Sequence, residues 1–136
     1  TFPKLMQGKP DYSFSGLKTE VRRRVEADGP FEGRVLADFC AGFQEAVVES
    51  LLEKAFNVAR DQLVLVGGVA ANSRLRARAL KLGAANGVSV RLPSLAFCTD
   101  NAAMIARAGQ IRLERGERSN LDLEARARWP LEELPS

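Results

Sequence analysis

The stretch whose residues are best suited to bind a ligand is LVLVGGVAANSRLR, residues 63–76. In it, a short apolar run is followed by two glycines and an asparagine. We expect the apolar run to be a buried parallel strand, and α/β sheets bind ligands at the carboxyl ends of such strands. Gly67 and Gly68 would let a nucleotide lie against the backbone, and the amide of Asn72 can meet a hydroxyl or phosphate oxygen. The structural alternative is a tight strand-to-helix turn with Asn72 as the helix cap. The spacing fits neither a dinucleotide-binding motif nor a P-loop, which would need a Walker lysine.

A second candidate is Asp100, within the segment FCTDNAAMIARAG, residues 97–109. Thr99 or Asp100 falls where a helix is expected to begin, so one interpretation is that Asp100 caps that helix. The functional interpretation is a carboxylate that binds a metal or a phosphate-associated cation at the mouth of the sheet. One carboxylate does not make a metal site, and the sequence contains no histidine, so further ligands would have to come from elsewhere.

Two weaker candidates are the segment DYSFSGLKT, residues 11–19, and a run of basic residues on the helix after the glycines. In the first, Ser13 or Ser15 can cap a helix, Gly16 can allow a close approach, and Lys18 can reach a phosphate or remain solvated.

On the helix after the glycines, Arg74, Arg78 and Lys81 share one face by their spacing. Such a face is usually solvated, and the functional alternative is contact with RNA phosphates.

The elements that must position these residues follow from the hydrophobic spacing. Helices are predicted over residues 17–25, 35–56, 73–85 and 101–116, and strands over residues 63–69 and 88–92. The alternation of helices and strands predicts an α/β fold with parallel strands and crossover helices. Two strands make a poor sheet on their own, so the sheet is incomplete. We therefore expect residues 1–136 to form a single partial domain, with residues 117–136 as a surface tail.

Composition limits the classes of function. The chain has 136 residues, 46% of them hydrophobic, and a net charge of +3, which does not by itself indicate nucleic acid binding. Cys40 and Cys98 form no disulfide or zinc pattern, so a reducing cytoplasm is the simplest expectation. No apolar run reaches the length needed to cross a membrane, and we expect no membrane association. The chain begins without an initiating Met, and we expect it to be part of a longer protein.

The segments DYSFSGLKT, LVLVGGVAANSRLR and CTDNAAMIARAG, in this order, closely resemble the C-terminal part of the TsaD family. These proteins are the tRNA threonylcarbamoyladenosine transferases, formerly described as O-sialoglycoprotein endopeptidases. The resemblance extends over about residues 2–110. It implies an actin-like ATPase fold of the sugar-kinase, heat-shock-protein-70 and actin superfamily, in which two related α/β domains enclose a nucleotide cleft. This chain would be the last part of the second domain.

The resemblance also implies an activity. The family transfers a threonylcarbamoyl group from threonylcarbamoyl-adenylate to adenosine 37, next to the anticodon, of tRNAs that read codons beginning with adenine. It implies that Asn72, with Gly67 and Gly68, contacts the adenylate or ATP in the cleft. Asp100 corresponds to a ligand of one divalent metal, usually iron, with zinc or magnesium as alternatives. The metal's work would be electrostatic, on anionic oxygens of the adenylate and on the carbonyl under attack.

In the family, two histidines of a His-x-x-x-His motif in the N-terminal half complete that metal set. The absence of histidine here therefore implies that the missing N-terminal half is needed as a partner. Paralogous TsaB-like and ATPase TsaE-like subunits are further implied partners if the protein is bacterial. An alternative function is a nucleotide-responsive interaction module of the modification complex, inactive in isolation. An endopeptidase is disfavoured because the sequence offers no zinc motif and no Ser-His-Asp or Cys-His set.

Overall fold

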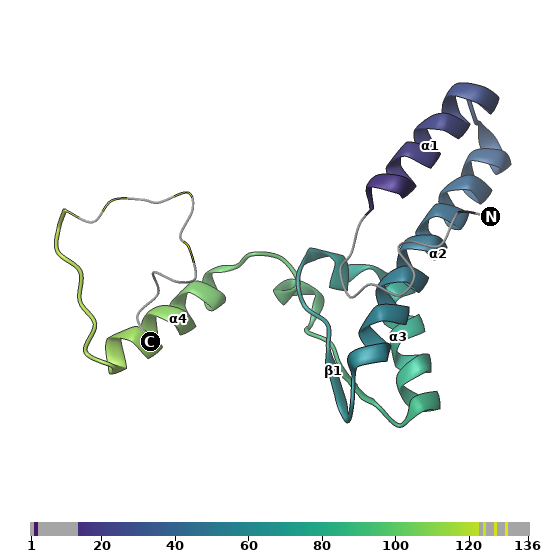
Figure 1. The fold of residues 1–136 in the computed structure, drawn as a ribbon. Coiled ribbons are helices and arrows are strands. Elements are labelled where there is room, and N and C mark those ends of the chain that lie inside the picture. Colours follow the sequence, from purple (N-terminus) through teal and green to yellow (C-terminus); the bar gives the residue numbers. More distant parts are fainter. Residues whose placement is uncertain (1, 3–13, 123, 125–126, 128–129, 131–136) are drawn as a thin grey trace. The chain divides into compact units, whose positions relative to one another are not determined.

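The computed structural model describes residues 2, 14–122, 124, 127 and 130, and its chain separates into two compact units. The first unit is Thr1–Thr99 and the second is Asp100–Ser136. Figure 1 shows the ribbon coloured along the sequence. Most of residues 1–13, with Ser13 among them, and most of the predicted surface tail lie outside the described residues.

The first two helices confirm the predictions from hydrophobic spacing. Helix α1 is Ser15–Asp28 and helix α2 is Gly33–Val58. Helix α2 extends two residues beyond its predicted range at each end, and α1 extends two residues before and three residues after its own. The start of α1 differs from the prediction of a serine cap. Phe14 occupies the capping position without a side-chain hydrogen bond, and Ser15 is already the first helical residue. The expectation that Ser15 caps this helix is therefore wrong.

The sheet contains two parallel strands among the described residues, β1 (Gln62–Val64) and β2 (Ser89–Arg91). Leu63 is paired with Val90, and the Leu65 N–H donates to the Arg91 carbonyl just beyond the ladder. The α/β prediction, with parallel strands and an incomplete sheet, is confirmed at this level.

The predicted strand over residues 63–69 is too long. The ladder ends at Val64, and the chain then turns through Gly67 into the 3₁₀ helix η1, Gly68–Ala71. Val66 is 72% exposed and Val69 is 59% exposed, so these two valines are not part of a buried strand. An apolar run that continues past the strand explains the error, because periodicity does not mark where the ladder ends.

Helix α3, Ser73–Asn86, connects the two strands and confirms its prediction closely. It ends at Gly87, which has φ 69°, a left-handed conformation that suits glycine. The core lies between α3 and α2, which pack side by side (Figure 1). Its fully buried residues are Val48, Leu52, Leu75 and Ala79.

The remaining elements lead into the second unit. After β2 comes the 3₁₀ helix η2, Leu95–Phe97, in a segment for which the sequence predicts neither a helix nor a strand. In the second unit, helix α4 spans Ala102–Glu114, and most of its described side chains are exposed. Within the part of the chain that the structure describes, no helix has both the length and the apolar character to cross a membrane.

Candidate functional site

The glycine pair forms an open turn between β1 and α3. Gly67 has φ 85° and ψ 174°, a conformation that is essentially restricted to glycine. Gly68 has no such backbone constraint. A Cβ atom built on either glycine would meet no heavy atom within 4 Å. The internal structure therefore explains glycine at position 67 by its backbone angles, but gives neither a packing nor a conformational reason for glycine at position 68.

Asn72 caps α3, as the structural interpretation predicted. Its Oδ1 accepts a hydrogen bond from the Leu75 N–H at 2.9 Å, and its Nδ2 donates to Gln44 Oε1 of α2 at 3.0 Å. Because the cap requires an acceptor, the orientation of the amide is fixed. Nδ2 carries two hydrogens and Gln44 takes one, so the second remains for a further acceptor. Capping and ligand binding are thus compatible roles for Asn72.

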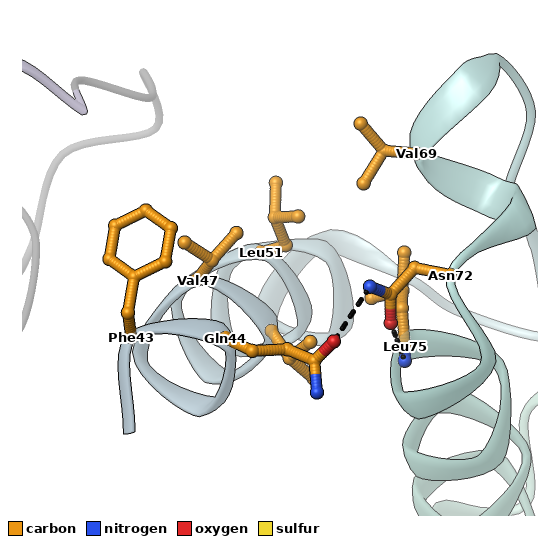
Figure 2. Close-up of a pocket in the computed structure, with 8 residues that line it drawn as sticks. Phe43, Gln44, Val47, Leu51, Val69, Asn72 and Leu75 are labelled. Carbon is orange, nitrogen blue, oxygen red and sulfur yellow. Dashed lines mark hydrogen bonds between the residues drawn. The ribbon is translucent and has the colours of Figure 1, made fainter. Parts of the chain in front are cut away.

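Asn72 also lines a cavity of about 240 Å³ between α2 and the turn (Figure 2). Its wall is largely apolar, and Figure 2 shows Val69 on the turn across from Val47 and Leu51 on α2. The polar groups at its edge are the amides of Gln44 and Asn72. The full lining is Phe43, Gln44, Val47, Val48, Leu51, Val69, Asn72 and Leu75.

The predicted basic face of α3 is mostly neutralised by α2. Arg74 forms two hydrogen bonds with the Glu45 carboxylate, from Nε at 2.6 Å and from Nη2 at 2.7 Å. Arg78 Nε lies 2.6 Å from Glu49 Oε1. Hydrogen bonding to Arg74 lowers the pKa of Glu45, and the same pair raises the pKa of Arg74.

Arg74 is exposed, as a solvated face predicts, and Arg78 is half-buried. Both arginines also hold α3 to α2 through their ion pairs, and contact with RNA phosphates stays a prediction. Lys81, the third residue of the predicted face, is exposed.

The structure separates Asp100 from the capping role that the sequence offered as one interpretation. Asn101 is the N-cap of α4, and its Oδ1 accepts from the Met104 N–H at 3.2 Å. Asp100 lies one residue before the cap, is exposed, and belongs to the second unit, whereas Asn72 belongs to the first. The interpretation of Asp100 as the helix cap is wrong. Its carboxylate is accessible, which a ligand-binding role requires.

The described residues do not assemble a metal site by themselves. No group of three or more histidine, cysteine, aspartate or glutamate side chains gathers in the described ranges. Asp100 can supply one carboxylate ligand, and the donors among the described residues alone do not fit a metal ion.

One residue that sequence reasoning missed is Arg76. It bridges the segments that follow the two strands, donating from Nη1 to the Ala70 carbonyl and from Nη2 to the Pro93 carbonyl, both at 2.9 Å. A signal for it exists in the sequence. Arg76 directly follows the buried Leu75 in the first turn of α3, so it flanks the core stripe instead of lying with Arg74.

Of the residues in the N-terminal candidate segment, Gly16 and Lys18 are exposed in α1. No described contact brings either of them to the glycine turn.

Comparison with known proteins places these features in a family context. The family model TsaD, described as tRNA N6-adenosine threonylcarbamoyltransferase, matches residues 1–107. A protein of that name from Anaeromyxobacter dehalogenans is 53% identical over 137 residues, covering 96% of this chain and 41% of the relative. Another from Geobacter sulfurreducens is 49% identical, covering 98% of this chain and 41% of the relative. The chain thus spans about two fifths of the length of these curated relatives.

Proposed function

Because this chain belongs to the TsaD family of tRNA N6-adenosine threonylcarbamoyltransferases and corresponds to its C-terminal part, we propose that the full-length protein transfers a threonylcarbamoyl group to tRNA. The donor is threonylcarbamoyl-adenylate, and the acceptor is the N6 amine of the adenosine next to the anticodon, in tRNAs that read codons beginning with adenine. This chain contributes part of the second domain of an actin-like ATPase fold. The confirmed parallel strands and the crossover helix α3 support that assignment.

The glycine turn and Asn72 form the part of the adenylate site that this chain supplies. The observation that carries the proposal is that nothing within this chain requires glycine at position 68. Neither its backbone angles nor its neighbours within this chain require glycine, and the space above it is open, so a ligand can approach the backbone there. Asn72 presents an oriented N–H donor at the end of the same turn. An amide donor there would bind an anionic or hydroxyl oxygen of the adenylate.

Asp100 is proposed as one ligand of a divalent metal, with iron as the first candidate and zinc or magnesium as alternatives. Its exposed carboxylate, freed from the capping role by Asn101, supports this assignment. The other ligands must come from the part of the full-length protein outside this chain, because the sequence has no histidine.

The test of the adenylate site is Asn72→Asp in the full-length protein. Aspartate keeps an oxygen that can cap α3, so we expect the thermal stability to stay near that of the wild type. It replaces the N–H donor with a negative charge, so the KM for threonylcarbamoyl-adenylate should rise by about tenfold or more, the effect of losing at least 1.4 kcal/mol. Transfer is measured by nucleoside analysis of initially unmodified tRNA.

If the Asn72→Asp variant keeps the wild-type KM for threonylcarbamoyl-adenylate, Asn72 serves only as a helix cap. Asn72→Ala is the matched control, since it removes both cap and donor and should lower the stability as well.

A second candidate function is a nucleotide-responsive interaction module within a modification complex. The exposed valines of the turn, Val66 and Val69 among them, favour a surface that another protein segment covers. The proposed partners are the N-terminal half, a paralogous TsaB-like subunit and an ATPase TsaE-like subunit. Nucleotide titration of this chain, with and without the N-terminal half, separates the two functions. Nucleotide binding by this chain alone favours the interaction module, whereas binding only in the presence of the N-terminal half favours the transferase.

A further inference from the structure

Arg76 occupies an unusual position on α3. It lies in the first turn, directly after the buried Leu75, and its side chain is half-buried. Arg74 and Arg78, on either side of it in the sequence, form ion pairs with glutamates of α2. Arg76 instead directs its guanidinium to backbone carbonyls and a thiol.

The two carbonyls belong to different loops. Ala70 is in η1, between Gly68 and Asn72, and is 1% exposed. Pro93 follows β2 and begins the segment that contains η2. Because β1 and β2 are parallel, both loops leave the sheet at the same edge. A guanidinium has N–H groups in a fixed fork, so one Arg76 side chain sets the spacing between the two loops.

The second loop is held together around the same arginine. The Cys98 thiol is buried, lies 3.9 Å from Arg76 Nη1, and donates to the Ser94 carbonyl at 3.5 Å. Arg76 therefore contacts both ends of the segment from Pro93 to Cys98, and the bond from Cys98 to Ser94 closes the segment on itself. In sequence, Asp100 follows the end of this segment after one further residue, Thr99.

We infer that Arg76 is a positioning residue for the adenylate site: it fixes the turn that contains Gly67, Gly68 and Asn72 against the Pro93–Cys98 segment. The inference rests on the proposed function. Arg76 itself need not touch the adenylate, because both of its Nη atoms already bond protein carbonyls. If the link is lost, each loop keeps its own internal hydrogen bonds, but the spacing between them is no longer set.

The test uses Arg76→Lys in the full-length protein. Lysine keeps the charge and the long stem, but its single nitrogen cannot reproduce the fork that reaches two carbonyls. Arg78→Lys is the matched control, with the same substitution on the same helix at a residue that contacts α2 instead of the loops. Arg76→Gln, which is uncharged and shorter, is a second variant in case the lysine adopts a compensating geometry.

The first measurement is amide hydrogen exchange without any ligand. The Ala70 and Asn72 N–H groups report on the turn, and the Phe97 and Cys98 N–H groups report on the second loop, because all four close local hydrogen bonds. Arg76→Lys should speed exchange in both loops together, whereas Arg78→Lys should leave both unchanged. Faster exchange in one loop only, or no change in either, overturns the coupling.

The second measurement is steady-state transfer. Arg76→Lys should raise the KM for threonylcarbamoyl-adenylate by about tenfold, the order expected for losing one hydrogen bond from a charged donor, and change kcat by less than about threefold. A merely structural role would lower the fraction of folded enzyme, and therefore kcat, at unchanged KM, and that result overturns the inference.

If the wild-type protein shows no transfer, the proposed function fails, and the hydrogen exchange still decides whether Arg76 couples the loops.

Discussion

Gly67 and Gly68 are neighbours, but the structure gives them different requirements. Gly67→Ala forces a Cβ atom into a backbone conformation that only glycine adopts readily, so it should lower the free energy of unfolding by about 1–3 kcal/mol. Gly68→Ala lacks that conformational cost and meets open space, so it should change stability by less than about 0.5 kcal/mol. Chemical denaturation of the two variants measures the difference.

Equal losses of stability for the two alanine variants would contradict the assignment of the strained backbone to Gly67. The Gly68→Ala variant then serves a second purpose. If it folds normally and binds the adenylate more weakly, the space above Gly68 is used by ligand.

Asp100 and Asn101 allow metal binding to be separated from helix capping. Asp100→Asn in the full-length protein should lower the bound metal, measured by elemental mass spectrometry, without lowering thermal stability, because Asp100 is not the cap. Asn101→Ala should do the opposite and cost about 1 kcal/mol of stability through loss of the cap. A loss of stability with unchanged metal content in Asp100→Asn would contradict the ligand assignment.

At the scale of elements, the contact between α3 and β2 depends on Gly83. A Cβ atom there would lie 2.6 Å from Val90 Cγ2 and 2.7 Å from the Val88 carbonyl oxygen. The backbone oxygen cannot move cheaply, so Gly83→Ala should destabilise by about 1–3 kcal/mol, despite alanine's better helix propensity. Thermal or chemical denaturation measures the loss.

Gly42→Ala in α2 is the matched control for Gly83→Ala. Its Cβ would meet only ordinary van der Waals contacts with Phe2, so helix propensity should dominate and stability should rise by up to about 1 kcal/mol. A stabilising Gly83→Ala would show that α3 and β2 can separate without cost.

The contact between α2 and α3 has a pH dependence that follows from Glu45. Hydrogen bonding to Arg74 lowers the pKa of Glu45 in the folded protein, so the unfolded chain binds its proton more readily. The pair therefore stabilises the fold above the ordinary glutamate pKa of about 4.3, and that stabilisation is lost as pH falls through the lower folded value. Glu45→Gln should remove this part of the acid sensitivity.

The control for Glu45→Gln is Glu53→Gln, an exposed acid on the same helix with no ion pair among the described residues. Denaturation midpoints are compared between neutral and acidic pH. An unchanged acid sensitivity in Glu45→Gln would mean that the pair with Arg74 contributes nothing in solution.

The elements were largely predictable and their ends were not. Helix α3 could be placed almost to the residue, because Asn72 and Gly87 mark its two ends by chemistry that acts locally. Strand β1 could not, because the apolar run through Val66 continues after the ladder has ended. The start of α4 is less well determined by sequence, because Thr99, Asp100 and Asn101 can all cap a helix and only the backbone decides that Asn101 does.

Some residues of the candidate site could also be found from the sequence, and others could not. Asn72 and the glycines could be found from the sequence because they are adjacent in it. The bridge from Arg76 to Ala70 and Pro93 could not, because it depends on how two loops meet at one edge of the sheet. The partners of Arg74 and Arg78 likewise lie on another helix, so sequence spacing within α3 gave no indication of them.

At the scale of the whole molecule, we expect this chain, purified alone, to show no threonylcarbamoyl transfer. The sequence has no histidine to join Asp100, and the described residues hold no cluster able to bind a metal. The chain also spans only 41% of relatives such as the Geobacter sulfurreducens protein. The measurement is incubation with threonylcarbamoyl-adenylate and unmodified tRNA, followed by nucleoside analysis. The full-length protein is the positive control, and clear turnover by the chain alone would contradict this expectation.

The two ion pairs between α2 and α3 also bear on how the two helices are aligned along their axes. Each pair joins residues 29 positions apart, and both pairs repeat after one helical turn. The core residues Val48, Leu52, Leu75 and Ala79 are closely packed between the two helices, which already favours one alignment. A slide of one turn would bring Arg74 beside Glu49, or Arg78 beside Glu45, and leave one acid and one base without partners. Exposed pairs of this kind add little stability, but they favour the same alignment as the core and the Asn72–Gln44 hydrogen bond, and so help to set where along α2 the glycine turn lies.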